Sequence, residues 1–219
     1  MRWASAASPS TTISTRSTDE VLGRGGGRMT GQLVVVPYDP QWPHRFEEIA
    51  ASLRDALGAL PVVAIEHVGS TSVPDLAAKP VIDVDVVVTR DIVRAAVAAI
   101  ASAGYEPLGE MGVPDRFAFR SPVGAPRQNI YVTVVGSLAL RNHLGLRDTL
   151  RACPDLRDEY GAVKLALAAR TDDIDVYVDG KTDIVLRILQ KVGLAQHELD
   201  ELEGVNRMVG DSVAKARPR

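Results

Sequence analysis

The sequence contains very little cysteine and has no long hydrophobic run. Cys153 is the only cysteine among 219 residues, so no internal disulfide can form, and this composition is typical of a reducing compartment. No apolar run approaches the roughly 18 residues that a membrane-spanning helix needs. The N-terminus also lacks the apolar core of a secretory signal. We therefore expect a cytoplasmic protein without a membrane partner.

A strong excess of positive charge is also absent. The formal net charge is −3 at pH 7, which argues against nucleic acid as the main partner. A Gly-x-x-x-x-Gly-Lys-[Ser/Thr] phosphate-binding loop is missing too, so a kinase of the P-loop type is not expected. Hydrophobic residues make up 46% of the chain, which is within the range of globular proteins.

The composition divides the chain into three parts. Residues 1–30 are rich in Ser, Thr, Arg and Gly and show no periodicity, which predicts a disordered extension. Because Met29 follows directly, an inert tail or a true start at Met29 is favoured over a transit peptide or a nucleic-acid-binding arm. Residues 31–194 form the predicted domain, and residues 195–219 are expected to be a loose polar tail.

Within the domain, hydrophobic periodicity predicts an α+β fold with a mixed β-sheet packed with helices and a helical C-terminal part. Strands are expected at residues 33–36, 62–67, 81–88, 105–110, 116–120 and 128–135. Helices are expected at residues 40–57, 92–104, 137–152, 155–170 and 173–192.

Two carboxylates carry the clearest chemical signal. Asp83 and Asp85 alternate with aliphatic residues from Val81 to Val88, so on a strand both side chains lie on one face. Two carboxylates on an apolar strand are costly to bury unless a cation lies between them, and Mg²⁺ prefers carboxylate and phosphate oxygens. The preceding Gly69-Ser70 turn can approach a phosphate closely. The alternative is an edge strand whose carboxylates pair with basic residues.

The residues around this motif resemble the GrpB family. The run from His67 to Asp83 contains His-Val-Gly-Ser-Thr-Ser-Val-Pro and Leu-Ala-Ala-Lys-Pro, which is similar to the family's characteristic stretch. Residues 36–43 and 146–151 are similar to its opening and its later Arg-Asp segment. The resemblance covers about Leu33 to Leu194 and implies a nucleotidyltransferase-like fold.

The resemblance also implies a function and a site. The expected activity is Mg²⁺-dependent transfer of a nucleotidyl group from a nucleotide triphosphate to a hydroxyl of a small molecule or a protein. Asp83 and Asp85 would be catalytic and hold the metal. By this resemblance Gly69 and Ser70 would contact the nucleotide phosphates. Thr71, Ser72, Lys79 and Arg120 are also expected to bind them, Arg120 because arginine suits bidentate phosphate contacts; for Lys79, pairing with Asp75 or a neighbouring acid is the alternative. Lys164, Lys181 and Arg116 are further candidates, although exposed basic residues are common.

The chain departs from the family pattern at the strand predicted for residues 128–135. Asn129 and Tyr131 stand where GrpB-like chains commonly have His-x-His, and no carboxylate is present there to complete a two-metal site. This departure weighs against turnover more than against nucleotide binding. An accessory, non-catalytic domain linked to coenzyme A biosynthesis is therefore the alternative, because GrpB-like domains occur fused to dephospho-CoA kinase.

Overall fold

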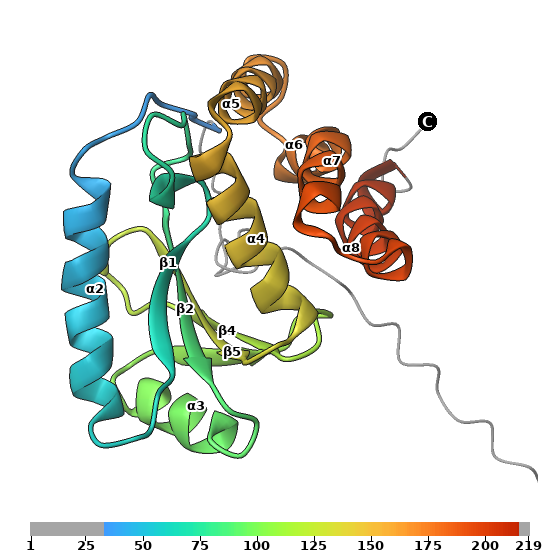
Figure 1. The fold of residues 1–219 in the computed structure, drawn as a ribbon. Helices are drawn as coiled ribbons and strands as arrows, with labels where there is room; N and C mark the ends of the chain where they lie inside the picture. Colours follow the sequence, from blue (N-terminus) through green and yellow to red (C-terminus); the bar gives the residue numbers. More distant parts are fainter. Residues whose placement is uncertain (1–32, 215–219) are drawn as a thin grey trace, which may run out of the picture.

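A mixed five-stranded sheet forms the centre of the domain in the computed structural model, which describes residues 33–214, with side chains up to residue 207. The strand order is β1-β2-β5-β4-β3, and only β2 and β5 run parallel within the sheet. The strands are β1 (Ala64–Val68), β2 (Ile82–Val88), β3 (Glu106–Gly109), β4 (Arg116–Arg120) and β5 (Gln128–Val134). Figure 1 shows this sheet between two layers of helices.

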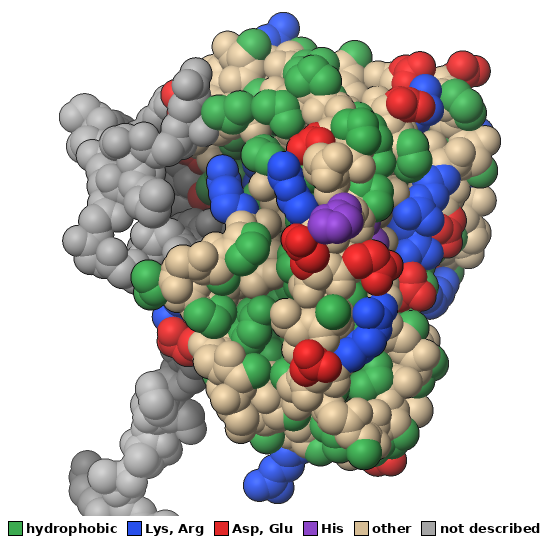
Figure 2. All heavy atoms as spheres, turned by 90° about the vertical axis from the view of Figure 1, so that its left-hand side faces the viewer, with side chains coloured by type: hydrophobic (Ala, Val, Ile, Leu, Met, Phe, Trp, Pro, Cys, Tyr) green, Lys and Arg blue, Asp and Glu red, His purple; other side chains and the backbone are tan. Residues whose placement is uncertain are grey.

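The two faces of β2 have different neighbours. Val84, Val86 and Val88 belong to a buried cluster with residues of α2 (Trp42–Leu57) and α3 (Val93–Ser102). Because successive side chains alternate, Asp83 and Asp85 face the other way, toward α4 (Leu138–Ala152). On the outer side of α2, basic and acidic side chains are interspersed (Figure 2), for example in the exposed pair Arg54 and Glu47.

The C-terminal helices form a second hydrophobic cluster. They are α5 (Pro154–Ala168), α6 (Ile174–Gly180), α7 (Thr182–Val192) and α8 (Gln196–Ala214). Ile188 and Leu189 on α7 pack in this cluster with Leu150 on α4 and Leu199 on α8. No helix among residues 33–214 is both long and apolar enough to cross a membrane.

The predicted α+β class is confirmed, but three expectations about its elements were wrong. Residues 33–36 make only an isolated bridge between Val36 and Ala78 and no strand. The helix expected at residues 173–192 is divided at Lys181, where Gly180 weakens the helix and the Thr182 hydroxyl donates to the Val178 carbonyl. The expected polar tail instead forms α8. The extension predicted for residues 1–30 lies outside the described residues.

Candidate functional site

The Gly69-Ser70 turn lies directly against the carboxylate of Asp83. Gly69 has a φ of +69° and leads into a short 3₁₀ turn, Ser70–Ser72. A Cβ atom added at Gly69 would lie 2.1 Å from Asp83 Oδ2, well inside any van der Waals contact. The turn therefore requires glycine for two independent reasons, its backbone conformation and the space that the carboxylate occupies.

A chain of buried hydrogen bonds fixes this turn to the sheet. His67 Nε2 lies 3.0 Å from Thr71 Oγ1, and the Thr71 hydroxyl donates to the Val81 carbonyl at 3.2 Å. Since the hydroxyl proton is used, His67 Nε2 must carry the proton of the first bond. Burial, followed by the charges of Arg151 and Arg147, lowers the pKa of His67 to about 4, which keeps the ring neutral near pH 7.

Two arginines of α4 hold the turn from the other side. The Arg147 guanidinium donates to the His67 carbonyl at 3.1 Å and to the Glu66 carboxylate at 2.7 Å. Arg151 donates twice to the Ser72 carbonyl, at 3.1 and 2.7 Å. The backbone on both sides of Gly69 is thus tied to one helix, which orients the remaining groups of the turn.

The two carboxylates of β2 have separate surroundings. Asp83 accepts a hydrogen bond of 2.8 Å from the amide nitrogen of Asn129 on β5. Asp85 is fully buried; it accepts a hydrogen bond of 3.1 Å from Thr133 Oγ1 and lies 2.8 Å from His143 Nδ1 on α4. The predicted shared face is confirmed, but Asp85 has polar partners of its own.

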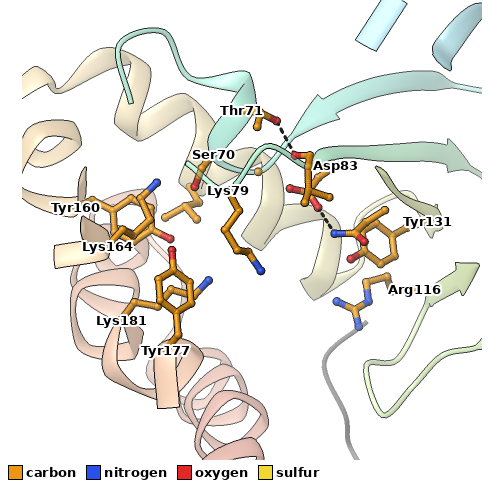
Figure 3. A pocket seen from close by; sticks show the side chains of 14 residues that line it. Ser70, Thr71, Lys79, Asp83, Arg116, Tyr131, Tyr160, Lys164, Tyr177 and Lys181 are labelled. Carbon is orange, nitrogen blue, oxygen red and sulfur yellow. Dashed lines mark hydrogen bonds between the residues drawn. The ribbon is translucent and has the colours of Figure 1, made fainter. Parts of the chain in front are cut away.

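A cavity of about 210 Å³ lies beside Asp83. Figure 3 shows Lys79 between the Asp83 side of the sheet and the lysines and tyrosines of the C-terminal helices. The wall of the cavity includes the Gly69-Ser70 turn, strands β2, β4 and β5, and helices α4 to α6. The lining residues are Gly69, Ser70, Thr71, Lys79, Val81, Asp83, Arg116, Asn129, Tyr131, Leu146, Tyr160, Lys164, Tyr177 and Lys181.

Four basic side chains and one carboxylate line this cavity. Arg116 lies over the Tyr131 ring, with 4.9 Å from Cζ to the ring centroid. Lys79 and Lys181 lie near the Tyr177 ring, with Nζ 5.7 and 5.2 Å from its centroid. Lys164 comes from α5 and is 1% exposed. With Asp83 as the one acidic residue of the lining, the cavity favours an anionic ligand.

Tyr160 connects the lysines to the turn. Its side chain is buried and shares a hydrogen bond with Ser70. Burial raises the pKa of Tyr160 to about 12, although the bond to Ser70 acts in the opposite direction. The hydroxyl therefore stays protonated at physiological pH and serves as a hydrogen-bonding group.

The structure brings together only some of the residues that the sequence singled out. Gly69, Ser70, Thr71, Lys79 and Asp83 line the cavity, whereas Ser72 and Asp85 lie outside the lining. Arg120 pairs with Glu106 on the neighbouring strand and also lies outside it.

His143, Tyr160 and Tyr177 were missed by the sequence reasoning. His143 is 58 residues from its partner Asp85, and the two tyrosines lie on apolar helix faces, where aromatic residues are ordinary core. For Tyr160 and Tyr177, the one available signal was that they lie close in sequence to the candidates Lys164 and Lys181.

The carboxylates limit how a metal ion can be held. Among residues 33–207, no group of three or more His, Cys, Asp or Glu side chains is arranged to hold one. Asp85 would have to leave Thr133 and His143 to share an ion with Asp83. The residues fit a Mg²⁺ ion held by Asp83 together with phosphate oxygens of a ligand, a common arrangement for this ion.

Comparison with known proteins assigns the family. The family model described as "GrpB protein" matches residues 32–191. The chain belongs to the GrpB family. The crystal structure of the conserved protein GrpB from Enterococcus faecalis is similar, with 33% identity and a TM-score of 0.63 over 74% of this chain and 100% of that one.

Two curated relatives of this GrpB chain are longer proteins. UPF0157 protein YqkA of Bacillus subtilis is 34% identical over 151 residues, which cover 68% of this chain and 44% of the relative. A dephospho-CoA kinase of Mycolicibacterium paratuberculosis is 33% identical over 174 residues, covering 66% of this chain and 42% of the kinase. The GrpB chain thus spans less than half the length of these two relatives.

Proposed function

We propose that the protein binds a nucleotide triphosphate together with Mg²⁺ in the cavity beside Asp83. The observation that carries the proposal is the convergence of Lys79, Arg116, Lys164 and Lys181 on a cavity whose single acidic group is Asp83. Lys79 comes from a loop, Arg116 from β4, Lys164 from α5 and Lys181 from the junction between α6 and α7. Such a set can neutralise several phosphate charges at once, and Gly69 allows close approach of a phosphate to the backbone.

Each residue has a part in this binding. Asp83 would hold Mg²⁺ from the side of the sheet, while Asn129 keeps its carboxylate oriented. When bound, Mg²⁺ would supply positive charge that offsets the charge of the phosphate oxygens. The lysines would stabilise the pyrophosphate end of the ligand, and Ser70 and Tyr160 would contribute hydroxyl groups.

The proposed reaction is transfer of the nucleotidyl group to a hydroxyl acceptor. The acceptor oxygen attacks the α-phosphorus, the bond from that phosphorus to the bridging oxygen breaks, and pyrophosphate leaves with the electron pair. The acceptor's proton passes to water or to a group on the acceptor. Asn129 occupies the position beside Asp83 where a third carboxylate would assist this step, so binding has stronger support than turnover.

A non-catalytic accessory domain is the second candidate function. Asp85 is engaged by Thr133 and His143, which leaves one carboxylate for a metal, and the chain matches part of a dephospho-CoA kinase. In this alternative the same cavity binds a phosphate-bearing precursor of coenzyme A without transferring anything.

The test is a thermal-shift screen with ATP, GTP, CTP, UTP and dephospho-CoA, each with and without Mg²⁺. At about 100-fold excess over Kd, a ligand should stabilise the protein by about 2.7 kcal/mol. Asp83→Asn should lose the Mg²⁺-dependent part of the shift but still fold, because the amide oxygen can accept from Asn129. Asp91→Asn, at an exposed position between β2 and α3, is the matched control and should behave as wild type.

The outcomes separate the two candidates. A Mg²⁺-dependent shift with one nucleotide, together with pyrophosphate release that Asp83→Asn abolishes, supports the transferase. A shift with dephospho-CoA and no pyrophosphate release supports the accessory domain. The absence of any shift would contradict nucleotide binding in this cavity.

A further inference from the structure

Lys164 is buried in the cavity wall and has no hydrogen-bond partner among the described residues. Its side chain is 1% exposed, and among the described residues its Nζ atom has no acceptor. Its described neighbour is the Tyr160 ring, 4.5 Å from Nζ to the centroid. A buried ammonium group is costly unless it is paired, so in the free protein the neutral amine is favoured.

The groups around Lys164 reinforce this preference. Lys181, between α6 and α7, repels a second positive charge and, after burial, is the other cause of a pKa well below the usual lysine value. Lys79 adds a third basic side chain to the same cavity, and the Tyr160 and Tyr177 hydroxyls complete its helical side. Among the residues that line the cavity, the one acidic group is Asp83, on the opposite, sheet side (Figure 3).

We propose that the helical end of the cavity is a subsite for a di- or triphosphate chain whose binding transfers a proton from solvent to Lys164. One N–H bond forms as the amine becomes an ammonium ion, and water or buffer supplies the proton. The phosphate oxygens then provide the acceptors that the amine lacks in the free protein. This inference rests on the proposed function, because it specifies what the same cavity recognises and how pH controls the binding.

The proton coupling has a definite sign. Burial and Lys181 hold the pKa of Lys164 low in the free protein, whereas a phosphate anion beside the amine raises it. Between the free and bound pKa values the complex holds about one proton more, so affinity falls about tenfold per unit of rising pH. Below the free-state value the amine is already charged, and affinity becomes independent of Lys164.

Isothermal titration calorimetry with sodium tripolyphosphate and with ATP tests the proposal on the full chain. Titrations with ATP at about pH 8.5, in two buffers with different ionisation enthalpies, count the protons taken up, because the last ionisation of a single terminal phosphate, near pH 6, is complete there. Tripolyphosphate, which still loses its own last proton in this range, tests binding and not the proton count. We expect wild type to take up about one proton and to lose affinity steadily as the pH rises. Lys164→Met should take up none and show a flat pH profile. Lys191→Met, an exposed change on α7, should match wild type.

The possible results separate this inference from the proposed function. Binding of ATP to wild type without proton uptake would overturn the coupling and leave nucleotide binding intact. Binding of neither probe would overturn both. Equal proton uptake by wild type and a folded Lys164→Met, checked by circular dichroism, would assign the proton to another group. Even if Lys164→Met does not fold, the proton count on wild type decides whether binding is coupled to proton uptake.

Discussion

At the residue scale, the site depends on how closely Gly69 and Asp83 approach each other. The glycine lets the backbone of the turn pass within contact distance of a carboxylate while adopting a positive φ. Two carbonyls beside it, those of His67 and Ser72, are held by arginines of α4. The turn is therefore rigidly supported, and a single added methyl group is sufficient to disturb it.

We predict that Gly69→Ala destabilises the fold by more than about 2 kcal/mol and displaces Asp83. The backbone of Gly69, with φ +69° and ψ −174°, lies in a region that is essentially restricted to glycine and costs other residues about 1–3 kcal/mol. The added Cβ would also lie 2.1 Å from Asp83 Oδ2, so the carboxylate must move. Urea denaturation measures the stability, and a Mg²⁺-dependent thermal shift reports on the site.

The matched control is Gly58→Ala at the end of α2. Gly58 also has a positive φ, +57°, but its added Cβ would meet nothing within 4 Å. It should show the cost of backbone strain alone and keep ligand binding. Equal losses of stability for the two variants, with binding retained in both, would contradict the proposed clash.

At the element scale, α8 supports the helices that supply Tyr177 and Lys181. Leu199 and Leu202 on α8 are 4% and 8% exposed and belong to the cluster with Ile188 and Leu189 of α7. Because α8 buries leucines in this cluster, it is a structural part of the domain, although most residues of its outer face are polar.

Leu199→Ala should therefore lower the free energy of unfolding by about 2–5 kcal/mol, since it removes buried methyl groups and leaves a cavity. Glu201→Ala, on the exposed side of the same helix, should change it by no more than about 0.5 kcal/mol. Chemical denaturation measures the free energy of unfolding of both variants and of wild type. If Leu199→Ala leaves the free energy of unfolding unchanged, α8 does not support the fold in solution.

At the scale of the whole molecule, the net charge does not describe the charge around the cavity. The chain carries a net charge of −3, and its α2 face carries both signs side by side (Figure 2). The cavity nevertheless collects four basic residues around one carboxylate, and Lys79, Arg116 and Lys181 are charged in the free protein. An anion is therefore attracted by the local field, against the net charge of the protein.

We predict that Lys181→Met weakens ATP binding and reduces its dependence on salt, because one of the charges that attract the phosphates is gone. Losing a charged hydrogen bond to a phosphate should cost about 1.5–3 kcal/mol, at least tenfold in Kd. Titrations across a range of NaCl concentrations measure both effects.

Lys191→Met changes the net charge by the same amount but lies on the exposed side of α7. It should keep the affinity and the salt dependence of wild type. If both variants weaken binding equally, the net charge controls binding and the local cluster of lysines does not.

The local features of this protein could be predicted from its sequence. The alternation around Asp83 and Asp85 predicted a strand with both carboxylates on one face, and β2 confirms it, because successive side chains of any strand point to opposite faces. The bounds of β4, Arg116–Arg120, also agree with the strand predicted for residues 116–120. The family resemblance also located the turn at Gly69.

Only the tertiary structure decided which of these groups act together. His143 reaches Asp85, Asn129 orients Asp83, and Lys164 and Lys181 join Lys79, in each case through contacts between segments far apart in the chain. Arg120 was assigned to the site from its residue type, yet its pairing with Glu106 depends on the neighbour that the sheet supplies. Local periodicity places side chains on a face, but the burial and long-range packing that select their partners arise only when the sheet and the C-terminal helices come together.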